Sequence, residues 1–306
     1  MTTLEHKPCS MNTNTEWSRT QKNLLLQCPR AWYMQYGKTN KQSSNHRSLT
    51  SQRPWNLMLR AMKETLMDQL EDLHQGKEWS QLLTKHQLYS NLKRRTNKSM
   101  YDVSNVRLES LLKFAQNRYS RLWRTRILRQ LCKNTHSQWY LFDRLEPVDI
   151  QGNLLFIAPD MVVRIQNKWH LFRFDMQSSA HSVCHEEEAN AMAIWAIQHN
   201  GFPQKPISFK LHTIAWHQGY WHQKTYQPSE KSVSNCSILL SNDMNAMKSI
   251  RTAGNRNPAL LPLAQHYRTC QSCAFRTFCP GGKDLAKAKK ELALLELSTK
   301  KRLLEA

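Results

Sequence analysis

Apolar residues at helical spacing dominate the first 130 positions of the chain. Between residues 20 and 37 they predict one helix or two short ones, interrupted near Pro29 and ended by Gly37. Residues 39–53 are rich in Asn, Gln, Ser and Lys, which indicates a loop. Three further helices are expected at residues 55–73, 79–92 and 106–132. The N-terminal half is therefore predicted to be mostly helical.

The pattern changes at about Gln138, where aromatic and β-branched segments begin. Three of them follow one another as QWYLFDRLEP, NLLFIAPDMVVRI and KWHLFRFDM, with Gly152-Asn153 and Gln166-Asn167 as turn signals, which predicts a meander of strands. Later elements are a helix at 186–199, strands at 207–215 and 220–226, a helix at 234–252 and a helical tail at 283–306. This order favours an α/β or α+β fold with a central mixed sheet flanked by helices.

Composition adds a strong charge imbalance to this picture. The chain has 44 Lys plus Arg against 23 Asp plus Glu, a formal net charge of +21, which favours a polyanionic partner, with nucleic acid as the first candidate. With 40% hydrophobic residues it has enough apolar material for one large domain or two modest ones. No stretch approaches the roughly 20 apolar residues of a membrane span, and no signal-peptide core is visible. We expect a cytoplasmic protein without membrane contact.

Four of the eight cysteines have a spacing typical of metal ligands. Cys28 stands near the N-terminus, whereas Cys270, Cys273 and Cys279 form a CxxC followed by a third cysteine near the C-terminus. In a reducing compartment such cysteines are more often metal ligands or reactive thiols than disulfides. One shared centre would staple the two ends of the chain together. The remaining thiols lack ligand spacing and are interpreted as incidental: Cys9, Cys132, Cys184 and Cys236.

The segment from Trp17 to Tyr33, with its Ser, short apolar helix and Cys-Pro followed by aromatic residues, resembles the opening motif of RecB-like PD-(D/E)xK nucleases that carry an iron–sulfur cluster. This group includes AddB-type recombination subunits and CRISPR spacer-acquisition nucleases, and its last three cysteines have the spacing found here. The resemblance implies a restriction-endonuclease-like core and a 4Fe-4S cluster held by Cys28, Cys270, Cys273 and Cys279. Four thiolates would also suit a structural zinc, and spacing alone does not separate the two.

The same resemblance implies a single RecB-like domain. Its expected parts are a flexible N-terminus at 1–16, the domain at 17–282 with a helical insertion at about 53–134, a sheet core at about 138–228 and a cysteine cluster at 270–279, and a terminal helix at 283–306. The terminal helix has an apolar stripe of Leu285, Ala288, Leu292 and Leu295. That stripe packs either against its own domain or against a partner subunit.

Cleavage in this family needs a carboxylate at one strand and a D/E-x-K pair on the next, because two acids hold Mg²⁺ while the lysine orients water or steadies charge. Asp160 matches the first acid, although Ile157 stands where the family usually has glycine. On the next strand Arg173 replaces the expected acid, and Asp175 occupies the lysine position. Strand alternation puts Arg173 and Asp175 on one face and Phe174 on the other.

A guanidinium cannot coordinate Mg²⁺ and would repel it from Asp160. We therefore expect a vestigial site in which Asp160, Arg173 and Asp175 form a salt-bridged trio. Other family positions have also changed: Ala191 stands for a Gln, Trp195 for a Tyr, and Lys63 for a helical His. The alternative is a rearranged Mg²⁺ site built from Asp160, Asp175 and one of Glu186, Glu187 and Glu188, although three acids at a helix start more simply complement its dipole.

A strongly basic helical region offers phosphate-binding side chains, interleaved with Tyr101, Tyr119 and Trp123. The candidate nucleic-acid residues are Arg30, Arg94, Arg95, Lys98, Arg118, Arg121 and Arg124. A solvated helix face with Tyr119 and Trp123 in the core is the simpler interpretation of the aromatic residues. Arg30, beside Cys28, contacts nucleic acid or offsets thiolate charge.

Together these observations predict a catalytically inactive nucleic-acid-binding subunit, with DNA as the expected partner and RNA as the alternative. We expect it to work in a larger DNA-processing, defence or mobile-element complex, with a helicase, nuclease or transposition protein as partner. Two alternatives stay open: an active Mg²⁺-dependent DNA nuclease with a rearranged site, and an architectural protein that docks an acidic partner.

Overall fold

The computed structural model describes residues 15–37, 53–99, 102–133, 138–179, 182, 184–271 and 273–305. The flexible N-terminus expected at 1–16 lies outside the described residues except for Thr15 and Glu16, as do Cys9, Tyr101 and nearly all of the predicted loop at 39–53.

The two N-terminal helices each begin at a residue whose side chain caps the helix. The N-terminal elements are β1 (Glu16–Ser18), α1 (Arg19–Gln27), α2 (Pro29–Trp32) and the π-helical turn η1 (Tyr33–Gly37). The Ser18 side chain caps α1 by accepting from the Gln21 backbone amide. Cys28 is extended between α1 and α2, and its Sγ accepts from the Ala31 amide, so the predicted break at Pro29 is confirmed. The three-residue strand β1 has no counterpart in the sequence prediction.

Four helices follow where helical spacing predicted them. They are α3 (Pro54–His74), α4 (Gln81–Asn97), α5 (Asn105–Leu122) and α6 (Arg126–Cys132). The single helix expected at 106–132 is interrupted, because Thr125 adopts an extended conformation at the start of α6. The described N-terminal half is thus mostly helical, as predicted.

The strands form two mixed sheets. The larger has the order β2 (Trp139–Leu141), β5 (Met161–Ile165), β6 (Lys168–Ser179), β7 (Phe209–His217) and β8 (Tyr220–Tyr226). Only β6 and β7 run parallel in it. The smaller has the order β1, β4 (Asn153–Phe156) and β3 (Val148–Ile150), with β1 parallel to β4.

The predicted α/β class with a mixed sheet is confirmed, whereas the simple meander is wrong. The segment NLLFIAPDMVVRI divides into β4 and β5, which belong to different sheets. Pro159, between them, has no amide hydrogen for a ladder, which disfavours one continuous strand. This division leaves Asp160 at the turn that enters β5.

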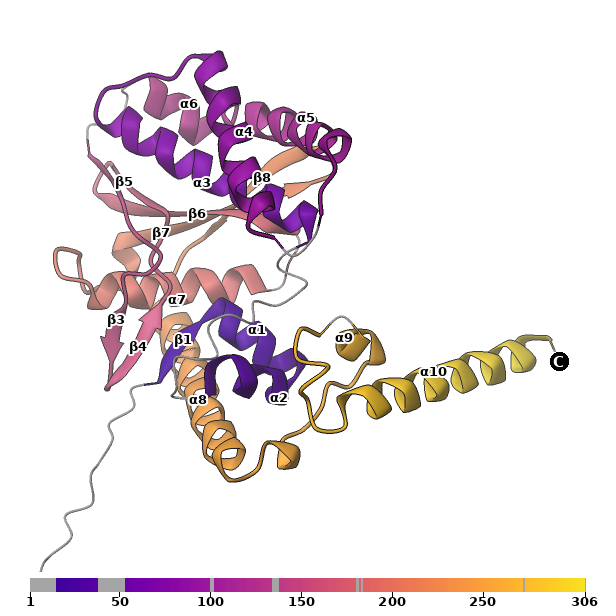
Figure 1. Cartoon of the computed structure of the whole chain (residues 1–306). Coiled ribbons are helices and arrows are strands. Elements are labelled where there is room, and N and C mark those ends of the chain that lie inside the picture. The colour runs from indigo at the N-terminus through magenta and orange to yellow at the C-terminus, as the bar shows by residue number, and fades with distance from the viewer. Residues whose placement is uncertain are drawn as a thin grey trace, which may run out of the picture.

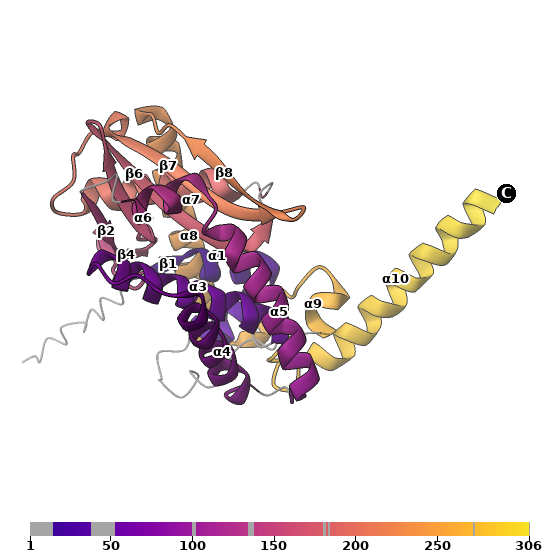
Figure 2. The same cartoon turned by 90° about the horizontal axis from the view of Figure 1, so that it is seen from above.

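The larger sheet lies between two helical layers (Figures 1 and 2). Helices α3 to α6 cover one face, where Phe172 and Phe174 pack with Met62 and other apolar residues of these helices. Helices α7 (Cys184–Gln198) and α8 (Glu230–Arg256) lie on the other side, where Leu171 belongs to a second core. The predicted alternation of β6 is therefore confirmed, with Arg173 on the α7 side.

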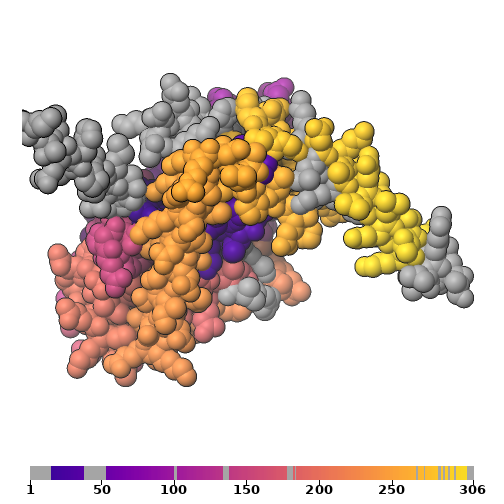
Figure 3. All heavy atoms as spheres, turned by 90° about the horizontal axis from the view of Figure 1, so that it is seen from below, coloured from indigo at the N-terminus to yellow at the C-terminus, as the bar shows by residue number. Residues whose placement is uncertain are grey.

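The N-terminal elements of the described chain pack against α8 and the segments that follow it. Figure 3 shows indigo N-terminal atoms directly against the orange and yellow C-terminal third. Gly254 in α8 permits this approach, since a Cβ there would lie 2.4 Å from the Tyr33 ring. The Tyr33 hydroxyl also donates to Asn255 Oδ1 at 3.0 Å. Short helical turns η4 (Pro206–Ser208) and η5 (Pro258–Leu260) and the helix α9 (Tyr267–Gln271) complete this part.

The last helix, α10 (Gly282–Glu305), extends away from the body (Figure 1). Leu292 and Leu295 of the predicted stripe are 59% and 63% exposed, so they do not pack against their own domain. In the part of the chain that the structure describes, no helix is both long and apolar enough to cross a membrane.

Candidate functional site

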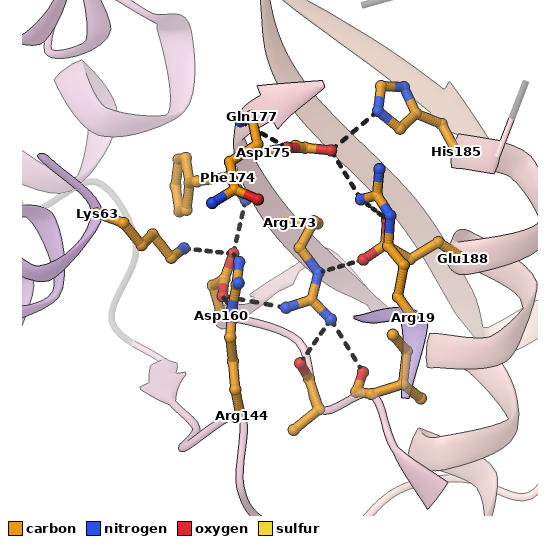
Figure 4. A network of polar contacts seen from close by, with 12 residues as sticks. Arg19, Lys63, Arg144, Asp160, Arg173, Phe174, Asp175, Gln177, His185 and Glu188 are labelled. Atoms are coloured by element: carbon orange, nitrogen blue, oxygen red, sulfur yellow. Dashed lines mark hydrogen bonds and ion pairs between the residues drawn. The ribbon is translucent and has the colours of Figure 1, made fainter. Parts of the chain in front are cut away.

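Eight charged or titratable side chains meet beside the larger sheet, and we call them the buried charge network (Figure 4). Two come from β6, two from the start of α7, and one each from α1, α3, the segment after β2 and the turn before β5. They are Arg19, Lys63, Arg144, Asp160, Arg173, Asp175, His185 and Glu188. The Asp160 backbone amide donates a hydrogen bond of 2.9 Å to the Phe172 carbonyl, which holds the turn beside β6.

The Asp160 carboxylate lies at the centre of this network and is fully buried. Its Oδ1 accepts from Arg144 Nε at 2.6 Å and from Arg173 Nη1 at 3.2 Å. Its Oδ2 accepts from the Phe174 amide at 2.7 Å and from Arg144 Nη2 at 3.2 Å, and Lys63 Nζ forms an ion pair with it at 2.5 Å. Since a carboxylate offers about four lone-pair sites, these five contacts occupy its binding capacity.

Arg173 connects the two halves of the network. Only 4% of its side chain is exposed, and it forms ion pairs at 3.2 Å with Asp160 and with Glu188. Its Nη2 also donates to the backbone carbonyls of Ile157 and Ala158, at 3.2 and 2.9 Å. The guanidinium charge is thus shared between two carboxylates and two carbonyl dipoles.

Asp175 extends the network toward α1 and α7. It accepts from Arg19 Nη1 at 2.7 Å and lies 3.2 Å from His185 Nε2, while Arg19 also reaches Glu188 at 2.5 Å. The predicted trio is therefore too small, because Glu188 is the second carboxylate partner of Arg173 and Asp175 faces Arg19 and His185. Four cationic side chains here neutralise three carboxylates.

Opposing effects set the charge states at the centre. Burial raises the pKa of Asp160, but the positive charges of Arg144, Lys63 and Arg173 outweigh it and hold that pKa well below its usual value. Burial lowers the pKa of Lys63 to about 7, helped by repulsion from Arg144 and Arg173, while Asp160 opposes the shift. The carboxylate is therefore ionised under all ordinary conditions.

This geometry leaves little capacity for a divalent cation. Cations already contact all three carboxylates, and Arg173 lies between Asp160 and Glu188. Among the described residues, no group of three His, Cys, Asp or Glu side chains is arranged to hold a metal ion. Glu188 does share the network with Asp160 and Asp175, as a rearranged site requires, whereas Glu187 pairs with Lys22. Two cavities of about 680 and 570 Å³ adjoin the network.

The depressed pKa of Lys63 predicts a stability that increases with pH. Between about pH 7 and 10 the unfolded chain, with a lysine pKa near 10.4, binds a proton that the folded chain does not. Unfolding then takes up a proton, so the free energy of unfolding rises with pH by up to about 1.4 kcal/mol per unit. Urea denaturation of wild type and Lys63→Met across this window measures it. Parallel curves for the two proteins would contradict the shift.

The four spaced cysteines line a second feature, which we call the four-cysteine cavity. Cys28, Cys270, Cys273 and Cys279 surround a space of about 70 Å³ together with apolar side chains that include Phe275. Because one water needs at least roughly 10–15 Å³, this space has room for several atoms. The seven described cysteines form no disulfide.

The donor set of this cavity fits a thiophilic metal group. The Ala31 amide donates to Cys28 Sγ and the Phe275 amide to Cys273 Sγ, both at 3.4 Å, and such bonds tune metal thiolates. A single zinc would bring its thiolates to roughly 3.8 Å from one another, given Zn–S bonds of about 2.3 Å. An iron–sulfur cluster holds them farther apart. The thiols as they lie do not make a single-ion site, and both groups remain predictions.

Arg30 differs from its prediction as a nucleic-acid residue. It is 5% exposed and donates to the backbone carbonyls of Ala259 and Leu261 at 2.6 Å and of Pro280 at 2.5 Å. Its guanidinium thus joins α2 to the segments on either side of the last three cysteines. The guanidinium N–H groups of Arg30 are used in hydrogen bonds to these backbone carbonyls, so Arg30 is not available to bind a phosphate.

The other candidate nucleic-acid residues occupy the helical layer with varied partners. Arg94 and Arg95 both pair with Glu64, Arg95 at 2.8 Å. Lys98 and Arg124 are exposed, and neither forms an ion pair with a described residue. Tyr119 is buried and donates to Gln69 at 2.7 Å, so its interpretation as a core residue is confirmed.

Arg118 and Arg121 meet aromatic rings instead of acids. Arg118 lies against the rings of Trp55 and Trp216, and Arg121 lies over Tyr220 while donating to the Gly219 carbonyl at 2.5 Å. Both arginines therefore link α5 to the turn between β7 and β8.

Sequence reasoning missed three members of the buried charge network: Arg19, Arg144 and His185. Arg19 follows the Ser18 cap of the family-like motif, which was a usable signal. Arg144 and His185 have no motif around them. They enter the network only because the segment after β2 and the start of α7 are packed against β6.

No protein-family model and no curated protein sequence matches this chain. A relation to the RecB-like nucleases therefore has only this chain's residues and their geometry as support.

Proposed function

We propose that this protein is a nucleic-acid-binding subunit with a PD-(D/E)xK nuclease-like fold whose metal centre has been replaced by ion pairs. The observation that carries this proposal is Asp160: the carboxylate that should hold Mg²⁺ is bound by Lys63, Arg144 and Arg173 instead. A buried carboxylate saturated by cations contributes to the fold and leaves no ligand for cleavage.

Two placements support the fold assignment. Asp160, in the turn that enters β5, contacts Arg173 of the antiparallel neighbour β6, as the family's strand pair requires. Lys63, aligned with the family's helical histidine, extends from α3 to Asp160. The Lys63 amine thus occupies the position where the family has a metal ligand, and its pKa of about 7 makes its charge depend on pH. Lys63 is nearly 100 residues from Asp160 in sequence, so no local pattern brings these two side chains together.

The cofactor proposed for the four-cysteine cavity is a 4Fe-4S cluster, with structural zinc as the alternative. Cys28, Cys270, Cys273 and Cys279 would hold it, and it would fasten α1 and α2 to the C-terminal segment. Arg30, with its three backbone carbonyls, already reinforces the same junction. The role of the metal group would be structural for either the cluster or zinc.

We further propose that the protein acts in the cytoplasm within a larger assembly. The exposed leucines of α10 are suited to docking on a helicase, nuclease or transposition protein. The net charge of +21 provides attraction to nucleic acid beyond any single contact.

Incubation of purified protein with labelled single- and double-stranded DNA, with Mg²⁺ or Mn²⁺, tests the central proposal. We expect salt-dependent binding without cleavage. Metal-dependent cleavage that disappears in a folded Asp175→Asn variant would establish the active nuclease instead. Binding that is absent, or insensitive to salt, would favour the architectural alternative.

Lys98 and Arg124, which are exposed and form no ion pair with a described residue, should contribute to the salt dependence. Each of Lys98→Ala and Arg124→Ala should reduce the slope of log affinity against log salt by about 0.9 for duplex DNA, because one phosphate contact is lost. Fluorescence anisotropy titrations over a salt series measure the slope. Lys77→Ala is the control, since Lys77 already lies 3.8 Å from Asp72. An unchanged slope in both variants would exclude the C-terminal ends of α4 and α5 from the duplex-binding surface.

A further inference from the structure

A cleft rich in aromatic and cationic residues lies between the start of α3, the middle of α5 and the turn joining β7 to β8. We call it the Trp55–Trp216 cleft, with a volume of about 660 Å³. Its walls include Trp55, Lys113, Phe114, Arg118, Trp216 and Gly219. Figure 1 shows α5 running beside β8, which brings these distant segments together. The cleft shares no lining residue with the cavities beside the buried charge network.

Arg118 is held in this cleft by rings. Its guanidinium carbon lies 5.2 Å from the centroid of Trp55 and 4.4 Å from that of Trp216. No described residue forms an ion pair with it. A guanidinium held through its face keeps its edge N–H groups free to donate, and such a planar fork matches a phosphate. Lys113 adds a second cation, and none of the described residues of the lining is acidic.

Trp55 and Phe114 present unusual exposed aromatic surface. Trp55 is 43% and Phe114 59% exposed, and the two rings meet edge to face with centroids 6.1 Å apart. At Gly219 the strip continues to Tyr220, which is 67% exposed and lies under Arg121. Flat rings beside cations combine the two contacts that an unpaired nucleotide needs, a face for its base and a donor for its phosphate.

We propose that the Trp55–Trp216 cleft binds single-stranded nucleic acid, with a base stacked on Trp55 or Phe114 and a phosphate on Arg118. Duplex bases stack on one another and offer no free faces, so these rings select unpaired strands. The inference rests on the proposed nucleic-acid binding and adds a strand preference and a location. It also separates binding from the nuclease-like centre, since the two regions have no residue in common.

The double variant Trp55→Ala/Phe114→Ala tests this cleft. Trp55 is 43% and Phe114 59% exposed, and neither belongs to the two large hydrophobic cores, so the circular dichroism and melting temperature should change little. Anisotropy with labelled oligothymidylate and oligouridylate should show at least about a tenfold loss of affinity, since each base–ring stack contributes roughly 1–3 kcal/mol. Duplex affinity should change less than about twofold. Tyr140→Ala is the matched control, because Tyr140 is 45% exposed and lies outside the cleft.

Arg118→Lys provides a second readout that keeps the charge. It should weaken single-strand binding while leaving the salt slope nearly unchanged, because a lysine cannot stack or form a fork. Equal losses for single strands and duplex in the double variant, or no loss for single strands, would overturn the cleft proposal alone. If wild type binds no oligonucleotide at all, the proposed function fails with it. Binding of polyglutamate in place of oligonucleotides would identify an acidic protein partner.

Discussion

Asp160→Ala is expected to lower the free energy of unfolding by about 3–5 kcal/mol, the largest single-residue effect that we predict outside the cysteines. The variant removes a fully buried anion and leaves Lys63 and Arg173 as neighbouring cations without their central partner. It also leaves the buried Phe174 amide without its acceptor. Removing one partner of a buried ion pair costs much more than the pair itself contributes, because the remaining charge is desolvated.

Urea denaturation followed by tryptophan fluorescence measures this loss. Glu64→Ala is the matched control, since Glu64 pairs with two cations, Arg94 and Arg95, at the surface. Surface pairs contribute about 0–1 kcal/mol each, so the control should lose far less. Adding Lys63→Met to Asp160→Ala should recover part of the stability by removing one stranded charge. A loss below about 1 kcal/mol for Asp160→Ala would mean that water replaces the carboxylate, and the network would then be an open site.

The free energy of unfolding should fall at acid pH because of the same carboxylate. The pKa of Asp160 is lower in the folded chain than the value of about 3.9 expected when unfolded, so the unfolded chain binds more protons as that value is approached. Its contribution to stability is present above about pH 5 and is lost progressively as the pH falls. Asp160→Ala should lack this part of the acid dependence.

Local patterns identified the central pair of the network but not its partners. Asp160 and Arg173 were predictable because strand alternation and a short motif act over a few residues. Glu188 was only one of three acids at a helix start. Its selection depends on which turn of α7 faces β6, and that is decided by packing among Ala191, Trp195 and the rest of the second core.

Arg30 and Arg118 show the same limit for basic residues. Both were predicted to be surface cations, because the sequence shows which residues are charged but not which residues surround them in the fold. The segment around Leu261 buries Arg30, while Trp55 and Trp216, more than 60 and nearly 100 residues from Arg118, hold its guanidinium. Helical spacing places Arg118 on one face of α5, but no local pattern predicts which aromatic rings pack against that face.

Cys273→Ser should remove the metal group proposed for the four-cysteine cavity and open the junction between α2 and the C-terminal segment. Cys273 lines the four-cysteine cavity, and its Sγ accepts the Phe275 amide at 3.4 Å. Hydroxyl is a far poorer ligand than thiolate for iron–sulfur or zinc. Because changes outside the ligand shell already cost roughly 10–100-fold in metal affinity, we expect metal content to fall by at least about tenfold. Loss of the proposed metal group would also remove the free energy that metal binding contributes to folding.

Anaerobic purification followed by iron, zinc and acid-labile sulfide analysis measures the first effect, and limited proteolysis between η5 and α10 measures the second. Cys132→Ser is the matched control, because Cys132 is an exposed free thiol outside the cavity. Brown wild-type protein with iron and sulfide identifies the cluster, and colourless protein with one zinc identifies the alternative. If wild type and Cys273→Ser hold equal metal and resist protease equally, the four thiols are ordinary core residues. The junction would then depend on contacts that involve no thiolate, which include the Arg30 hydrogen bonds, the Tyr33–Asn255 hydrogen bond and the packing of Tyr33 on Gly254.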